Sequence, residues 1–62
     1  MTPEQQRLAE SVRQACLKAA REGYAEAAAS GLCHEGAMEA SLDAVKMLDL
    51  KTVLGAAGKK PG

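Results

Sequence analysis

Side chains of nucleophile, base and acid type stand next to one another at Cys33, His34 and Glu35. A cysteine at the start of a helix has its pKa lowered by the helix dipole, and a histidine can ligate a metal or accept a proton. These three residues are therefore the candidates for a metal or thiolate site. Neighbouring helical residues point about 100 degrees apart, however, and zinc takes about four ligands. We therefore favour a structural role for these residues in the turn between two helices. A metal site would require ligands from two or more chains.

A second candidate is the acidic stripe formed by Glu35, Glu39 and Asp43 at spacings of four. In di-metal helical bundles such carboxylates accompany a Glu-x-x-His pattern on the inner face. Here the single histidine precedes the acids, which lie on the polar side of the expected helix. We expect the stripe to face solvent or to pair with Arg13 and Arg21 of a neighbouring helix. Without a phosphate loop or a Ser/His/Asp set, the sequence predicts no enzyme activity and no cofactor.

The elements that position these residues are two predicted helices joined by a short turn. Thr2 and Pro3 are typical of a helix start, with a hydroxyl cap before a proline at the first helical position. The first helix is expected over about 3–30, ended by Gly31, which takes the left-handed conformation without steric cost. The second is expected over about 33–48. Because the link is short, the two helices are predicted to be antiparallel neighbours.

After the hairpin, Asp49 is expected to cap a short turn of helix, 50–54, which ends at Gly55. The sequence thus predicts an all-α fold with a helical hairpin domain over 1–55. Residues 56–62 have little apolar surface to bury and are predicted to form a disordered tail. No apolar run is long enough for a signal peptide or a membrane span, so a cytoplasmic protein without a membrane partner is expected.

The apolar pattern indicates how the helices pack. On the first helix one arc carries Leu8, Val12, Cys16, Ala20, Gly23 and Ala27. Its second half is built from small residues, so the partner helix is expected to approach closely there. On the second helix the apolar side carries Met38, Ser41, Leu42, Val45 and Leu48, with Ala37 and Ala44 beside them. In such a hairpin Cys16 lies roughly 25 Å from Cys33, too far for a disulfide, and it is expected to be a buried small side chain.

The composition favours self-association. There is no Phe, Ile or Trp, and one Tyr against thirteen Ala, and a chain this short buries only about 60% of its unfolded surface. Leu17, Tyr24 and Ala28 form a second apolar strip on the first helix, outside the core arc. We therefore predict a homodimer, a four-helix bundle with Leu17, Tyr24, Ala28, Leu50 and Leu54 at the interface. Its core would contain Leu8, Val12, Met38, Leu42, Val45 and Leu48.

Charge narrows the choice of function. The formal net charge is zero, which gives no electrostatic case for nucleic acid or an anionic membrane as the main ligand. The sequence predicts a small structural or protein-interaction module that binds itself and, through the same surfaces, other proteins. Two alternatives stay open. One is a thiol or metal site at Cys33 and His34 assembled across chains, and the other is a small dimeric regulator that binds nucleic acid.

A resemblance rests on Gly31 through Gly36, Glu39, Ala40, Ala44 and Leu48-Asp49-Leu50. With these residues the chain resembles a set of short proteobacterial proteins of unknown function, which share a long first helix, Gly-Leu-Cys-x-Glu-Gly and a terminal Leu-Asp-Leu. The likeness covers most of residues 3–50 and implies a helical hairpin rather than an activity. Such proteins are sometimes labelled acetyltransferases, but 62 residues cannot supply the sheet and acetyl-coenzyme A loop of the common acetyltransferase fold. Met38 stands where the pattern predicts an aromatic residue, which puts in doubt any role that rests on a ring there.

Overall fold

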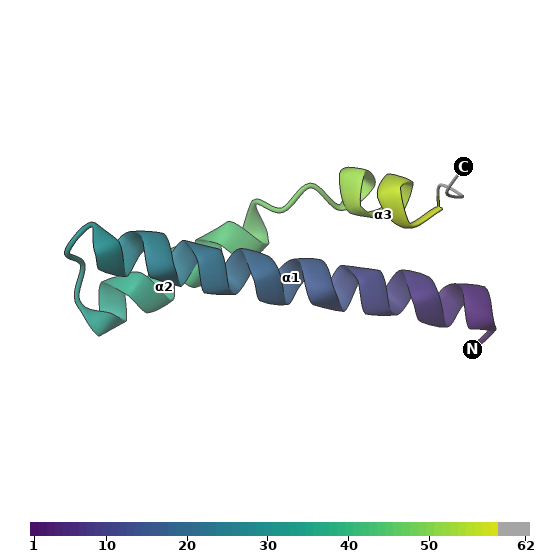
Figure 1. The fold of residues 1–62 in the computed structure, drawn as a ribbon, viewed down its shortest axis with the longest axis horizontal. Helices are drawn as coiled ribbons and strands as arrows, with labels where there is room; N and C mark the ends of the chain where they lie inside the picture. Colours follow the sequence, from purple (N-terminus) through teal and green to yellow (C-terminus); the bar gives the residue numbers. More distant parts are fainter. Residues whose placement is uncertain (59–62) are drawn as a thin grey trace.

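The structure, a computed structural model, describes residues 1–58 as three helices without a strand. They are α1 (Pro3–Ala29), α2 (His34–Lys46) and α3 (Leu50–Gly58). Figure 1 shows α2 turning back along the half of α1 that precedes the turn, and α3 lying along the half nearer the N-terminus. Both short helices pack against α1. The all-α class and the predicted hairpin are therefore confirmed.

The start of α1 is fixed by a capping box. The amide of Gln5 donates to Oγ1 of Thr2 at 3.1 Å, and the amide of Thr2 donates to Oε1 of Gln5 at 3.0 Å. Pro3 follows at the first helical position, where its missing N–H leaves no hydrogen bond unmade. The helix start predicted at Thr2 and Pro3 is confirmed, and Gln5 adds the reciprocal bond.

The turn is closed by the backbone at Gly31, whose φ is +94°. The amide of Leu32 donates to the carbonyl of Ala27 at 3.1 Å, and that of Gly31 donates to the carbonyl of Ala28 at 3.0 Å. These two bonds are the Schellman arrangement that satisfies the last carbonyls of a helix. The helix therefore ends at Ala29, with Ser30 as its C-cap, one residue before the predicted end.

The contact between α1 and α2 is a seam of small residues. A Cβ added at Gly23 would lie 2.8 Å from Cβ of Ala44 and 3.1 Å from the carbonyl oxygen of Ala40, so the two backbones approach closely at this point. Ala27, at 9% exposure, and Ala37, at 1%, are the buried hydrophobic residues of the described part of the chain. The close approach predicted for the second half of α1 is confirmed.

The face of α2 that meets α1 is rotated from the predicted one. Its centre is Ala37 and Ser41, which are both buried, whereas Met38 and Leu42 are 44% and 63% exposed. The physical reason is the seam itself, because only small side chains fit where Gly23 brings the backbones together. Larger side chains are displaced to the flank. The other four predicted core residues are half-buried in the single chain: Leu8, Val12, Val45 and Leu48.

Two predicted helix ends are wrong. α2 ends at Lys46 rather than Leu48, with Met47 as its C-cap. α3 continues through Gly55 to Gly58, because one glycine inside a helix costs only about 1 kcal/mol and two alanines follow it. The tail predicted over 56–62 thus begins inside a helix, and residues 59–62 lie outside the described part.

Candidate functional site

The candidate metal or thiol site lies at the start of α2, where the structure does not bring its three side chains together into a ligand set. Cys33 is the N-cap residue, is exposed, and makes no capping hydrogen bond with its side chain. Glu35 lies exposed in the first turn. Within residues 1–58, no three His, Cys, Asp or Glu side chains lie close enough together to hold a metal ion.

His34 is instead engaged by Tyr24 of α1. The hydroxyl of Tyr24 lies 2.9 Å from Nδ1 of His34, and the two rings meet edge to face with centroids 5.8 Å apart. Which of the two atoms donates depends on the tautomer of the imidazole. In either case Nδ1 is engaged by the hydroxyl, so Tyr24 and His34 form a clamp between the two helices.

This contact also defines a surface, which we call the hairpin face. Because Tyr24 touches His34, the Tyr24 side of α1 and the His34 side of α2 lie on the same side of the hairpin. Helical spacing adds residues to that side: on α1 the residues seven before and four after Tyr24, and on α2 the residues four, eight and eleven after His34. The hairpin face comprises Leu17, Tyr24 and Ala28 of α1 with Met38, Leu42 and Val45 of α2.

The hairpin face is apolar and open. Leu17 is 47% exposed, and Met38 and Leu42 stand out on α2 as described above, while Tyr24 and Val45 are half-buried. Three of the predicted interface residues thus lie on one surface. Sequence reasoning assigned Met38 and Leu42 to the core of the four-helix bundle and did not connect them with Tyr24. Their spacing of four and eight residues from His34 was the available signal.

The other two predicted interface residues, Leu50 and Leu54, lie elsewhere. Both belong to α3, which packs on the N-terminal half of α1, and they are 50% and 45% exposed. Among residues 50–55 of α3, Val53 is half-buried on that contact. The predicted interface is therefore divided into a larger surface on the hairpin and a smaller one on α3.

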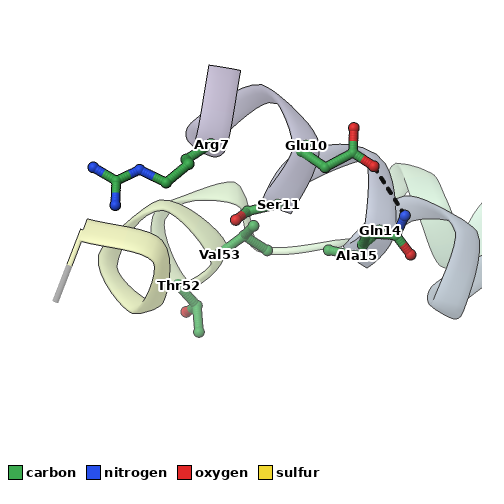
Figure 2. Close-up of a pocket in the computed structure, with 7 residues that line it drawn as sticks. All are labelled: Arg7, Glu10, Ser11, Gln14, Ala15, Thr52 and Val53. Atoms are coloured by element: carbon green, nitrogen blue, oxygen red, sulfur yellow. Dashed lines mark hydrogen bonds between the residues drawn. The ribbon is translucent and has the colours of Figure 1, made fainter. Parts of the chain in front are cut away.

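Between α1 and α3 runs an open groove, shown in Figure 2. Its lining consists of Arg7, Glu10, Ser11, Gln14, Ala15, Thr52 and Val53. The carboxylate of Glu10 accepts a hydrogen bond from Nε2 of Gln14 at 3.0 Å and forms an ion pair with Arg13 at 3.3 Å. Since these partners hold Glu10 on the surface of its own helix, the groove presents hydroxyl groups and one arginine but no nucleophile paired with a base.

One carboxylate has a shifted pKa. Hydrogen bonds from the side chain and then the backbone of Thr52, with a smaller contribution from the backbone of Lys51, hold the pKa of Asp49 below its ordinary value. Oδ2 accepts from the Thr52 hydroxyl at 2.7 Å, and Oδ1 accepts from the amide of Lys51 at 3.0 Å. Asp49 is thus the N-cap of α3, as the sequence predicted, and its chemistry is structural.

Comparisons with known proteins give no match: no family model, no curated protein and no solved structure is similar to the chain. The resemblance to short proteobacterial hairpin proteins therefore stays a prediction. Among residues 1–58, no helix combines the length and the apolar character that a membrane crossing requires.

Proposed function

We propose that the chain is a small structural or protein-interaction module that acts as a homo-oligomeric helical bundle, with the hairpin face as its main contact. This is a binding role without a chemical reaction. The proposal keeps the cytoplasm as the expected compartment. It takes a second copy of the chain as the first partner and leaves other proteins as further partners of the same surfaces.

The observation that carries the proposal is the imbalance between what the chain buries and what it exposes. The buried residues of the described part are two alanines and Ser41, whereas eight large apolar residues are exposed. A buried large side chain contributes about 1.5–3 kcal/mol, and an alanine much less. The large apolar side chains therefore give most of their stabilisation only when another surface covers them.

The overall dimensions support the same conclusion. The Cα radius of gyration is 14.1 Å, against about 10.6 Å for a compact chain of this length. The accessible surface is 5060 Å², whereas a compact monomer of this mass exposes about 3,800 Å². The difference, roughly 1,300 Å², exceeds the ~800 Å² per partner that a standard interface buries. The accessible surface of the chain is thus as large as expected for one subunit of an oligomer.

Native mass spectrometry of the protein purified without added metal or reductant tests the proposal. One spectrum reports the subunit number, any covalent link through Cys33 and any bound mass. We expect a non-covalent dimer or higher oligomer of the mass of the chain alone. A monomer at micromolar concentration would contradict the proposal, and extra mass that a chelator removes would favour a site at Cys33 and His34.

A pair of substitutions then tests the surface. Leu17→Glu places a charge on the hairpin face and is expected to dissociate the oligomer, because the charge would be buried without a partner. Lys18→Glu changes the next residue, which points away from that face, and is expected to leave the oligomer intact. Sedimentation of both variants measures the result. If Leu17→Glu still sediments as an oligomer, the hairpin face is not the contact.

A further inference from the structure

The hairpin face has edges of opposite charge. On α1 its outer edge carries Arg21, which lies four residues after Leu17 and three before Tyr24. On α2 its outer edge carries Glu35 and Glu39, three residues before Met38 and Leu42 respectively, and at its far end Lys46, four residues after Leu42. Residues at these spacings are neighbours on a helix surface. All four charged residues are exposed.

The structure also fixes which residues lie level along the hairpin. Gly23 faces Ala40, Ser41 and Ala44 across the seam. Because the helices are antiparallel, Arg21, two residues before Gly23, lies level with about residues 43–44, and a rise of about 1.5 Å per residue places it about one turn from the height of Glu39. The cationic residue of α1 and Glu39 therefore lie about one turn apart in height, on opposite sides of the apolar strip.

From these charges, and on the basis of the proposed function, we propose that the hairpin face binds a second copy of the chain in one orientation. The two-fold axis runs parallel to the helices, so that α1 of each copy lies over α2 of the other. A rotation about such an axis does not change the position of a residue along the helices. Each Arg21 then meets Glu39 of the second copy. Two equivalent ion pairs border one apolar core of Leu17, Tyr24, Met38 and Leu42.

The other two-fold arrangement places like charges together. If the axis crossed the helices at right angles, α1 would lie over α1 and α2 over α2, in opposite directions. Arg21 would then approach Arg21 of the second copy, and Glu39 would approach Glu39. Lys46, farther along the α2 edge, would meet Glu35 of the second copy, but at the ends of the interface. The charges nearest the centre favour the first arrangement.

Neutralising substitutions separate the two arrangements by the sign of their effect. In the proposed dimer, Arg21→Gln or Glu39→Gln removes an attraction at two symmetric places, and we expect the dissociation constant to rise about threefold to tenfold. In the alternative dimer the same variants remove a repulsion, and the dissociation constant would fall. Analytical ultracentrifugation at low ionic strength measures the change, with circular dichroism to verify that the helices persist.

Two further variants complete the experiment. The charge exchange Arg21→Glu with Glu39→Arg restores opposite pairs, so we expect its dimer to be within about twofold of the unchanged chain. Glu26→Gln is the matched control, because Glu26 lines a groove with Ala27 and Ala44 on the opposite side of the hairpin, and it is expected to leave dimerisation unchanged.

The outcomes distinguish the two proposals. If the unchanged chain is a monomer, the proposed function fails. If it is a dimer and the single neutralisations tighten it or have no effect, the proposed function stands and the orientation is overturned. Weakening by both single variants, recovery in the charge exchange and no effect of Glu26→Gln together support the orientation.

Discussion

At the residue scale, Gly23 determines how close α1 and α2 come. No side chain stands between the two backbones there, and the nearest atoms across the seam are Cβ of Ala44 and the backbone of Ala40 and Ser41. Backbone atoms of a helix cannot move aside one at a time as the end of a long side chain can. Any added atom at this position must therefore push the helices apart along the seam.

We predict that Gly23→Ala destabilises the chain although alanine is the better helix former. The helix gains about 1 kcal/mol from the substitution, while overpacking against fixed backbone costs about 1–3 kcal/mol. The expected net effect is a loss of about 1 kcal/mol in the free energy of unfolding, measured by urea denaturation.

Gly55→Ala provides the matched control. It adds the same methyl group inside a helix, but a Cβ at Gly55 would meet no atom within 4 Å. Here the gain in helix propensity is not opposed, so stability should rise by about 0.5–1 kcal/mol. A stabilising Gly23→Ala would show that the seam is looser than the structure has it.

At the element scale, the three helices are stabilised by different interactions at their ends. α1 starts with the reciprocal bonds of Thr2 and Gln5, and the backbone around Gly31 closes it. α2 has no side-chain cap at Cys33 and is held by its seam and by the clamp between Tyr24 and His34. α3 depends on the cap at Asp49 and on packing against α1, where Val53 is half-buried. The cap therefore matters most for α3.

We predict that α3 loosens in acid. The pKa of Asp49 is lowered in the folded chain from its ordinary value of 3.8, so its contribution to stability is fully present above that value. It is lost as the pH falls through the lowered pKa, because protonation removes the negative charge that strengthens the hydrogen bonds from Thr52. Amide resonances of Lys51 and Thr52 should report the change as the pH falls below 3.8.

Asp49→Asn serves as the control for this titration. The amide oxygen of asparagine still caps a helix but does not ionise, so the α3 amides of this variant should not respond to acid. Equal acid responses of both proteins would mean that other carboxylates, and not Asp49, control α3.

The local devices at the helix ends were predictable from the sequence, because Thr2-Pro3, Gly31 and Asp49 act through their own neighbours. The end of α3 was not predictable in this way, because the low helix propensity of Gly55 is offset by the high helix propensity of the two alanines after it. The clamp between Tyr24 and His34 depends on how the two helices are rotated against each other. That rotation follows from the fit of Ala37 and Ser41 against α1, which a helical wheel of α2 alone does not contain.

At the scale of the whole molecule, the chain is extended, with dimensions of 42 × 25 × 14 Å. If its exposed apolar residues are covered by a second copy, unfolding and dissociation are linked. The melting temperature should then rise by about 5 °C for each tenfold increase in protein concentration. Scanning calorimetry over a hundredfold range of concentration measures this. A concentration-independent melting temperature is the result expected of a monomer and would contradict the proposed function.

The sharing of α1 by two separate partners has a consequence for how the chain opens. Within residues 1–58, α2 and α3 each pack on α1 and not on each other, and a short linker over 47–49 joins them. Such an architecture contains two cooperative units that share α1. Each of the shorter helices can separate from α1 while the other stays packed on it. In native-state hydrogen exchange, the amides of α3 should therefore lose protection at lower denaturant than those of the Gly23 seam. Proteolysis at the linker would release α3 and leave the hairpin closed.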